Sequence, residues 1–204
     1  MVDSPPDEAG LIAAAREGQV EAFNTLVRRY QSPLYNLAYR LLGDTEAAAD
    51  ATQEAFIAAF QHLAQFQAGH DGSFRAWLYR IATNACYDAL RRNKRRPTVS
   101  LDQADLEARL VSTADPPEVA TQRLALNRAI QACLDALPDD QRTVIVLCDV
   151  QEFDYQQIAT ITAQALGTVK SRINRARARL RDCLNLDAVR ELLPDSYRPD
   201  KQTK

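Results

Sequence analysis

The stretch GTVKSRINRARARLR, residues 167–181, contains five arginines and one lysine in a chain whose formal net charge is −2. At about 100° per residue, the rotation of an α-helix, its apolar side chains share one stripe, formed by Val169, Ile173, Ala176 and Leu180. The opposite side carries cations and small or hydrogen-bonding groups, at Lys170, Ser171, Asn174, Arg175 and Ala178. The segment is therefore predicted to be an amphipathic helix with an apolar back and a basic front.

A basic helix face is often no more than solvent-exposed surface. Such surfaces usually mix charges of both signs, whereas residues 167–182 contain a single acid, Asp182. A face of one sign with Ser and Asn among its cations suits the major groove, where phosphates attract cations and base edges need hydrogen-bond donors. The segment alone leaves both interpretations open.

Length and composition limit the fold class. The chain has 204 residues, enough for one domain or two small ones, and 46% of them are hydrophobic. No stretch alternates with period two for long, so an all-α fold is predicted. Charge is also segregated: residues 75–96 and 167–182 are basic, and the acidic residues 101–118 lie between them. This arrangement indicates two basic patches joined by an acidic linker.

Several classes of protein are disfavoured. No apolar run reaches about 18 residues, and the start MVDSPPDEAG lacks the features of a signal peptide, so a cytoplasmic protein without membrane insertion is expected. The sequence shows no glycine-rich phosphate loop, no histidine near a nucleophile and no paired carboxylates in an apolar setting. An enzyme, a cofactor and a small-molecule substrate are therefore not expected.

The cysteines do not suggest a metal site. They are far apart, no CxxC motif occurs, and His62 and His70 are the only histidines. We expect buried free thiols at Cys86, Cys133, Cys148 and Cys183.

Turn residues and periodicity divide the chain into helices. The first four are expected at residues 7–17, 20–42 (with a bend near Pro33), 44–63 and 74–94. A proline-bounded stretch without periodicity, residues 97–117, reads as a flexible linker. Four further helices are expected at residues 118–136, 139–150, 155–161 and 166–184. The predicted architecture is thus two small helical domains, residues 7–96 and 118–186, with a tail at 187–204.

The last two predicted helices are joined by the short segment TAQA, residues 162–165. A short helix, a tight turn and a basic helix are the ingredients of a helix-turn-helix.

The first basic patch lies on the predicted helix from Phe74. Beside its apolar stripe runs a second stripe of aromatic rings, cations and one amide, formed by Trp77, Arg80, Asn84, Tyr87 and Arg91. Single-stranded nucleic acid needs rings on which bases can stack and charges for its phosphates. In the alternative interpretation, Trp77 and Tyr87 only widen the core face.

The predicted helix 44–63 has an acidic, amide-bearing stripe, formed by Asp50, Gln53, Glu54, Ile57 and Gln61. Phe56 and Phe60 are expected to face the core. The stripe is unsuited to DNA, and it is either solvent-exposed surface or a docking face for a basic partner.

Three segments together resemble bacterial sigma factors of the extracytoplasmic-function (ECF) type. They are DATQEAFIAAFQHLAQF (50–66), SFRAWLYRIATNACYDALRRNKRR (73–96) and the stretch from LDALPDD to RARLR (134–181). These look like the segments of that family that bind core polymerase, melt and read the promoter −10 element, and bind the −35 element. Their order, with a linker between the second and third, makes the resemblance specific.

The resemblance implies a role for each set of residues. Residues docking on the clamp helices of the polymerase β′ subunit would be Asp50, Gln53, Glu54 and Ile57. Residues at the −10 element would be Phe74, Trp77, Arg80, Asn84, Tyr87, Arg91 and Arg92, with residues 67–74 helping to capture a flipped base. Residues in the −35 major groove would be Lys170, Ser171, Arg172, Asn174 and Arg175. Further implied partners are the polymerase β flap, promoter DNA and an anti-sigma factor.

The chain departs from the family in the turn before the basic helix. The family usually has glycine and an aliphatic residue there, and this chain has Ala163 and Gln164. Alanine tolerates a positive φ poorly, so the turn either takes another geometry or costs some stability.

Two functions of other classes are also considered. A stand-alone helix-turn-helix regulator would explain residues 167–181 but leave the stripe from Trp77 to Arg91 unused, and it would normally dimerise. A helical-bundle enzyme lacks a visible site. Co-purification with core RNA polymerase would separate a sigma factor from a stand-alone regulator.

Overall fold

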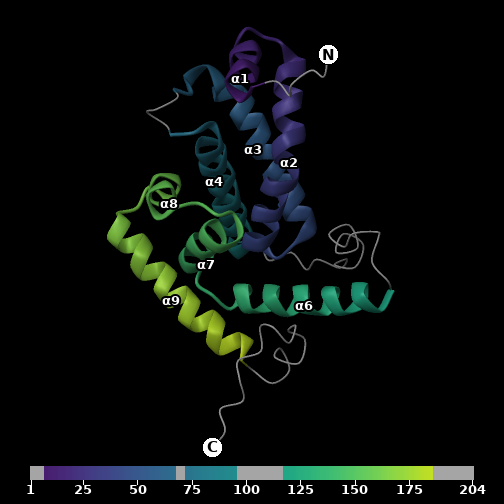
Figure 1. Ribbon diagram of the computed structural model, residues 1–204, viewed down its shortest axis with the longest axis vertical. Coiled ribbons are helices and arrows are strands. Elements are labelled where there is room, and N and C mark those ends of the chain that lie inside the picture. Colours follow the sequence, from purple (N-terminus) through teal and green to yellow (C-terminus); the bar gives the residue numbers. More distant parts are fainter. Residues whose placement is uncertain (1–6, 68–71, 96–116, 186–204) are drawn as a thin grey trace, which may run out of the picture.

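The computed structural model describes residues 7–67, 72–95 and 117–185, and all regular structure in these ranges is helical (Figure 1). The N-terminal part contains α1 (Glu8–Arg16), α2 (Val20–Leu42), α3 (Thr45–His62), the 3₁₀ turn η1 (Leu63–Gln65) and α4 (Phe74–Arg95). The C-terminal part contains α6 (Pro117–Asp135), α7 (Asp139–Ile145), the π-helical turn η2 (Val146–Val150), α8 (Tyr155–Thr162) and α9 (Leu166–Leu184). The predicted linker up to residue 116 and the predicted tail lie outside the described residues.

Local turn chemistry sets the helix ends. Gly43 ends α2 in the left-handed conformation, with φ 69°. A Cβ at this position would also come within 3.1 Å of the Asp135 carboxylate, which would have to shift slightly to make room for it. Asp44 then caps α3 by accepting a hydrogen bond from the Ala47 N–H at 2.7 Å. Pro33 lies inside α2, which remains one continuous helix.

The N-terminal bundle is formed by α2, α3 and α4 around leucines of α2 and alanines of α3. Four of the seven α3 alanines recur every three or four residues and are buried: Ala48, Ala51, Ala55 and Ala59. Their small side chains let α3 approach its neighbours closely. The buried leucines of α2, Leu26, Leu34 and Leu37, fill the space between the helices. The prediction that Phe60 faces the core was wrong. Its side chain is 47% exposed and packs edge-on against Phe23, with 4.9 Å between ring centroids.

The C-terminal helices α7, α8 and α9 enclose a second group of fully buried side chains: Val144, Val146, Leu147, Ile158, Val169 and Ile173. The single helix predicted for residues 139–150 is α-helical only to Ile145. It then widens into η2, where the Gln151 N–H donates to the Val146 carbonyl at 3.0 Å. This wider turn places the segment Gln151–Phe153 at the start of the loop that leads to α8.

The helix-turn-helix prediction is confirmed in its geometry, with α8 followed by a short turn and α9. Asp154 and Gln157 form a reciprocal capping box at the start of α8. Ala163 ends α8 in the left-handed conformation, with φ 52° and ψ 43°. The turn thus keeps the geometry that glycine favours. The sequence left open whether the turn takes another geometry or costs some stability, and the second alternative is the one observed.

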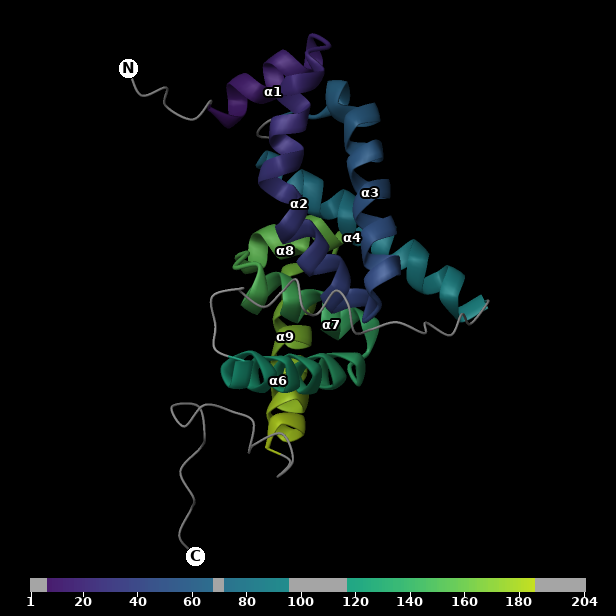
Figure 2. The ribbon, with the colours of Figure 1, turned by 90° about the vertical axis from the view of Figure 1, so that its right-hand side faces the viewer.

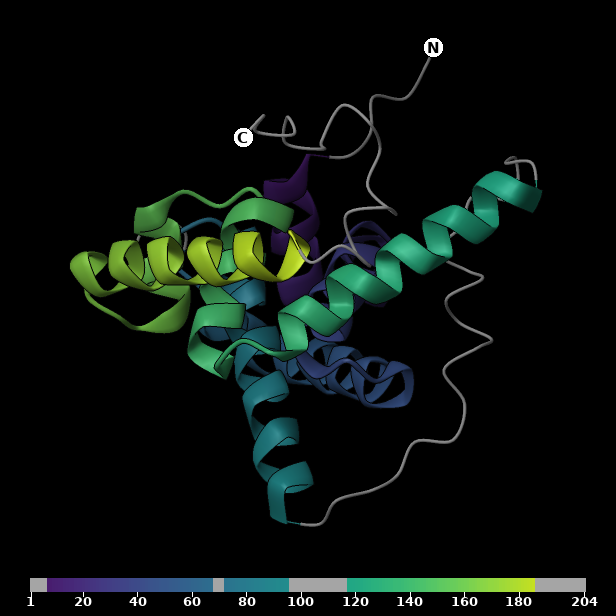
Figure 3. The same ribbon diagram turned by 90° about the horizontal axis from the view of Figure 1, so that it is seen from below.

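Helix α6 projects from the body of the molecule and joins it near its C-terminal end (Figures 1 and 3). There Cys133 forms a disulfide with Cys183 at the end of α9. The prediction of free thiols was therefore wrong for these two residues, and it holds for buried Cys86 and partly buried Cys148. The two partners are 50 positions apart, and the contact between α6 and α9 brings them together.

The two parts pack against each other rather than standing apart. In Figure 2, α7 and α8 lie behind α2 and α4, and buried side chains of both parts form one continuous core. Arg142 of α7 is buried at the junction and donates to three main-chain carbonyls, those of Leu41 (2.7 Å), Asp135 (2.9 Å) and Leu137 (3.3 Å).

Replacing Ala163 by glycine is expected to stabilise the protein. The left-handed conformation strains alanine, and the gain exceeds the extra chain entropy that glycine adds to the unfolded state. We expect the free energy of unfolding to rise by about 0.5–1 kcal/mol, measured by urea denaturation. The control Ala178→Gly removes the same methyl from the exposed middle of α9 and should lower stability by about 1 kcal/mol. A stability loss for both variants would contradict the strain at Ala163.

Candidate nucleic-acid interface

Helix α9 presents the basic front that its sequence predicts. Val169, Ile173 and Ala176 are fully buried, and this anchors the helix against α7 and α8. On the opposite side, Lys170, Asn174 and Arg175 are exposed and Ser171 is half-buried. The Arg175 guanidinium donates to the Ser171 hydroxyl at 3.2 Å, and that hydroxyl donates to the Thr168 carbonyl at 2.9 Å. These bonds give the Arg175 side chain a defined direction along the exposed face.

Two arginines of α9 form ion pairs with acidic residues of this chain. Arg172, which the family resemblance placed in the −35 set, pairs through Nε with Asp140 of α7 at 2.8 Å, and a quarter of its side chain is exposed. Arg177 holds both carboxylate oxygens of Asp149 in η2, at 2.6 and 3.1 Å. The hydrogen bond with Asp149 raises the pKa of the Arg177 guanidinium further above its already high value. Both arginines therefore fasten α9 to α7 and η2, the elements on which it rests.

The structure places Phe74 and Trp77 of the predicted −10 set in the core. They are 3% and 5% exposed. Their rings pack with Phe66 at centroid distances of 5.6 and 5.2 Å and with each other at 5.6 Å. The interpretation in which Trp77 widens the core face describes this arrangement, because the ring closes the space between α4 and the end of η1.

The rest of that set lies along one side of α4. Asn84, Arg91 and Arg92 are exposed and Arg80 is half-buried. Tyr87 is half-buried, and its hydroxyl donates to the Thr143 hydroxyl of α7 at 2.9 Å. Burial raises the pKa of the Tyr87 phenol, which therefore remains a neutral hydrogen-bond donor.

The five residues of the acidic stripe of α3 are all exposed: Asp50, Gln53, Glu54, Ile57 and Gln61. Ile57 is 50% exposed, and Phe60 extends the apolar part of this face. Glu54 receives hydrogen bonds from Arg92 of α4 on both carboxylate oxygens, each at 3.2 Å. The acidic stripe and the basic side of α4 are thus linked by the Glu54–Arg92 pair. A partner that binds the charged group of Glu54 or of Arg92 must replace this contact with its own.

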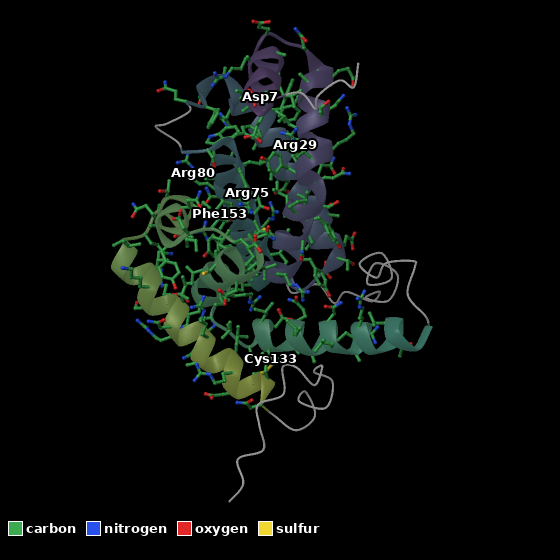
Figure 4. The ribbon with its side chains drawn as sticks, viewed as in Figure 1. Asp7, Arg29, Arg75, Arg80, Cys133 and Phe153 are labelled. Atoms are coloured by element: carbon green, nitrogen blue, oxygen red, sulfur yellow. A yellow bond between two sulfur atoms is a disulfide. The ribbon has the colours of Figure 1, made fainter. Side chains whose placement is uncertain are left out.

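A group of residues that was not predicted from the sequence connects α4 to the C-terminal part. The Phe153 ring stands edge-on to Tyr79, with 4.8 Å between centroids, and the Arg75 guanidinium lies 4.1 Å from the Phe153 ring centroid (Figure 4). The Tyr79 hydroxyl donates to the Gln151 side chain at 2.7 Å. In the sequence, Phe153 is an isolated aromatic residue shortly after the apolar run that ends at Val150. This pattern suggests a contact for the ring but does not identify Tyr79 or Arg75 as its partners.

Among the described residues, no group of three or more His, Cys, Asp or Glu side chains is placed to hold a metal ion. None of the described helices combines the length and apolar composition that crossing a bilayer requires.

Family comparisons match both parts of the chain. Residues 26–96 match the family model described as Sigma-70 region 2, and residues 127–180 match the model described as Sigma-70, region 4. Together these two segments cover more than half of the chain. The chain belongs to the sigma-70 family, and its relatives place it in the ECF group.

One curated relative is the ECF RNA polymerase sigma factor SigW of Bacillus subtilis, 37% identical over 125 residues, which are 59% of this chain and 66% of that protein. The matches span less than two thirds of the length of the curated relatives. Among solved structures, CnrH in complex with the cytosolic domain of CnrY is 27% identical, with a TM-score of 0.63 over 87% of this chain and 96% of that one. The sigma factor RpoE in complex with the anti-sigma factor NepR, from Bartonella quintana, is 25% identical, with a TM-score of 0.63 over 81% and 98%.

The two arginines at positions 172 and 175 provide a matched pair for testing the face of α9. Arg175→Ala should weaken binding to a −35 duplex by about 1–3 kcal/mol if the side chain reads a base edge. Arg172→Ala, which breaks the pair with Asp140, should lower the melting temperature and change DNA affinity less. Lys170→Ala, as a phosphate contact, should weaken all sequences alike and make the salt slope shallower by about one unit.

Titrations of matched and scrambled duplexes at several salt concentrations measure these differences. Equal losses on both duplexes for Arg175→Ala would show that this residue does not read sequence.

Proposed function

We propose that this protein is a promoter-specificity factor that binds core RNA polymerase and directs transcription initiation at promoters with −35 and −10 elements. The observation that carries the proposal is the order of the two matched regions in one chain, each with an exposed face of the matching chemistry. In this role the protein works in the cytoplasm and is not itself an enzyme.

Polymerase binding is assigned to the acidic stripe of α3. Asp50 and Glu54 offer carboxylates, Gln53 an amide, and Ile57 an exposed apolar side chain at the centre of the contact. A basic helical surface such as the β′ clamp helices would match these charges and cover Ile57. Interfaces commonly combine such an apolar anchor with a polar rim. The polymerase β flap is proposed as a further contact of the C-terminal part.

Binding of the −35 duplex is assigned to Lys170, Ser171, Asn174 and Arg175 of α9. Exposed cations contribute affinity through phosphates, and Asn and Arg side chains can discriminate bases in the major groove. Arg172 supports this face from the side through its pair with Asp140. The fixed turn at Ala163 sets the angle at which α9 leaves α8.

Promoter melting is assigned to the exposed side of α4. Asn84 is exposed between the positions of Arg80 and Tyr87, and its amide can donate and accept hydrogen bonds at the edge of a flipped base. Arg91 and Arg92 follow along the helix and would contact the strand's phosphates. Flipping a base costs a few kcal/mol, and hydrogen bonds and stacking in the pocket must offset this cost.

A dedicated anti-sigma factor is proposed as the regulator. Of the two similar solved structures, one has CnrH bound to the cytosolic domain of CnrY and the other has RpoE bound to the anti-sigma factor NepR. The stand-alone regulator is the less favoured function, because it would leave the α3 stripe and α4 without a role. Co-purification with core polymerase separates the two functions.

Gln53→Arg is expected to weaken binding to core polymerase at least tenfold, because it places a positive charge between Asp50 and Glu54 that repels a basic partner. The fold should stay intact because Gln53 is exposed. Gln31→Arg makes the same change at an exposed position of α2 and should have little effect. The measurement is a pull-down of core enzyme, titrated with each variant; equal retention by the two variants would rule out docking through α3.

Asn84→Ala should impair opening of the promoter and base selection at −10, while polymerase binding and −35 binding stay unchanged. The reason is that a methyl group cannot make the hydrogen bonds that compensate for unstacking. Permanganate footprinting of the transcription bubble, run beside the pull-down, measures both properties. A normal bubble in the variant holoenzyme would show that Asn84 is only a surface amide.

A further inference from the structure

Helix α1 precedes the segment that matches the region 2 family model, which begins at residue 26. It lies at one end of the N-terminal bundle, at the opposite end from α6 (Figure 1). The polymerase, −35 and −10 contacts assigned above do not involve α1. Its side chains nevertheless contact the residues that flank the segment 67–73, between η1 and α4.

Arg16, the last residue of α1, contacts the end of η1 in two ways. Its Nε donates a hydrogen bond to the Leu63 carbonyl at 3.1 Å. Its guanidinium lies 5.7 Å from the centroid of the Phe66 ring, within the range of cation–π attraction. The same Leu63 carbonyl also accepts a hydrogen bond from the Phe66 N–H at 3.2 Å. Arg16 therefore holds both the carbonyl that turns the chain at Phe66 and the Phe66 ring itself.

The start of α1 acts on the start of α4 through Tyr30 of α2. The Tyr30 hydroxyl donates to the Glu8 carboxylate, and the Tyr30 ring lies 5.8 Å from the Phe74 ring, between centroids. Burial raises the pKa of the Tyr30 phenol, which therefore remains a neutral donor. Helix α1 thus supports Phe66 from its last residue and, through Tyr30, Phe74 from its first.

Phe66 and Phe74 contact each other at the two ends of the segment 67–73. Their ring centroids are 5.6 Å apart, and the two residues are 2% and 3% exposed. Trp77 packs on both rings and lies about two helical turns before Asn84. Because the segment begins and ends at one pair of buried rings, a shift of the Phe66 ring would change where the segment stands relative to Asn84.

We propose that Arg16 is a positioning residue for base selection at the −10 element. It acts through Phe66, by fixing the ring pair from which the segment 67–73 and the helix that carries Asn84 both start, and it does not contact the DNA itself. This inference rests on the proposed function of α4. The ligand concerned is an unstacked base of the melted strand.

Loss of this contact should affect base discrimination more than overall affinity. Hydrogen bonds to a base edge require a correct distance and angle. Attraction of phosphates by Arg91 and Arg92 depends much less on exact position. A displaced ring pair would therefore weaken the choice of base and leave phosphate binding intact. If Arg16 itself met a phosphate, its removal would instead lower the affinity for all sequences alike.

Arg16→Met removes the hydrogen bond and the charge while keeping an unbranched side chain that favours a helix. Arg28→Met is the matched control, because Arg28 is an exposed arginine of α2 that donates to the Thr25 hydroxyl of the same helix. Holoenzyme assembled from core polymerase and each variant selects DNA from a pool with a randomised single-stranded stretch, and the retained DNA is quantified and sequenced. Arg16→Met should lower the base preference about three- to tenfold without reducing the amount retained, whereas Arg28→Met should change neither quantity.

Arg16→Lys tests whether the contact itself matters, because an ammonium group can still donate to the Leu63 carbonyl and lie near the Phe66 ring. It should restore part of the preference that Arg16→Met loses. All selections are run below the melting temperature of each variant, so that a loss of stability does not imitate a loss of positioning. An unchanged base profile with Arg16→Met, or an equal loss of all sequences, would overturn the proposal.

The wild-type holoenzyme distinguishes failure of this role from failure of the proposed function. A sharp wild-type preference that Arg16→Met leaves unchanged would disprove only the positioning role, and α4 would keep its assignment. A wild-type holoenzyme without any base preference in the single-stranded stretch would contradict the proposed function of α4, and with it the role of Arg16.

Discussion

The Arg142 guanidinium is the interaction on which the arrangement of the helices depends. Its nitrogens donate to carbonyls that end α2 and follow the end of α6, where helices leave such groups without partners and where the helix dipole is negative. Asp135 adds a carboxylate oxygen 3.4 Å from Nη1. A buried cation without such partners would be strongly destabilising. The arginine therefore satisfies carbonyls at the ends of two helices, and these carbonyls compensate for burying its charge. Together these contacts place α7 at the junction of the two parts.

The position of α7 determines what the two basic helices can do. It supports α9 through a buried apolar seam and the Asp140–Arg172 pair, and it touches α4 through Thr143 and Asp139. A short helix thus contacts both elements to which DNA recognition is assigned. The distance between α4 and α9 is consequently set by α7 and by the elements that pack against it.

Features that depend on local chemistry were predictable from the sequence. Gly43 and Asp44 mark a helix boundary, the apolar stripe of α9 repeats with the helical period, and the exposed stripe of α3 follows from the same periodicity. Features that depend on the tertiary fold were not. Trp77 sits on the flank of its helix and is buried only because Phe66 lies over it, and Phe60 is exposed because four alanines occupy the seam of α3. The partners of Arg142, Phe153 and Cys133 lie far away in the sequence.

The disulfide between Cys133 and Cys183 has a topological consequence. It closes residues 133–183 into a covalent ring that contains α7, η2, α8 and nearly all of α9, whereas most of α6 lies outside it. A single cut in the backbone anywhere within this ring would leave both fragments joined through sulfur. In the oxidised chain a protease therefore needs two cuts, not one, to detach the basic helix from the rest of the molecule.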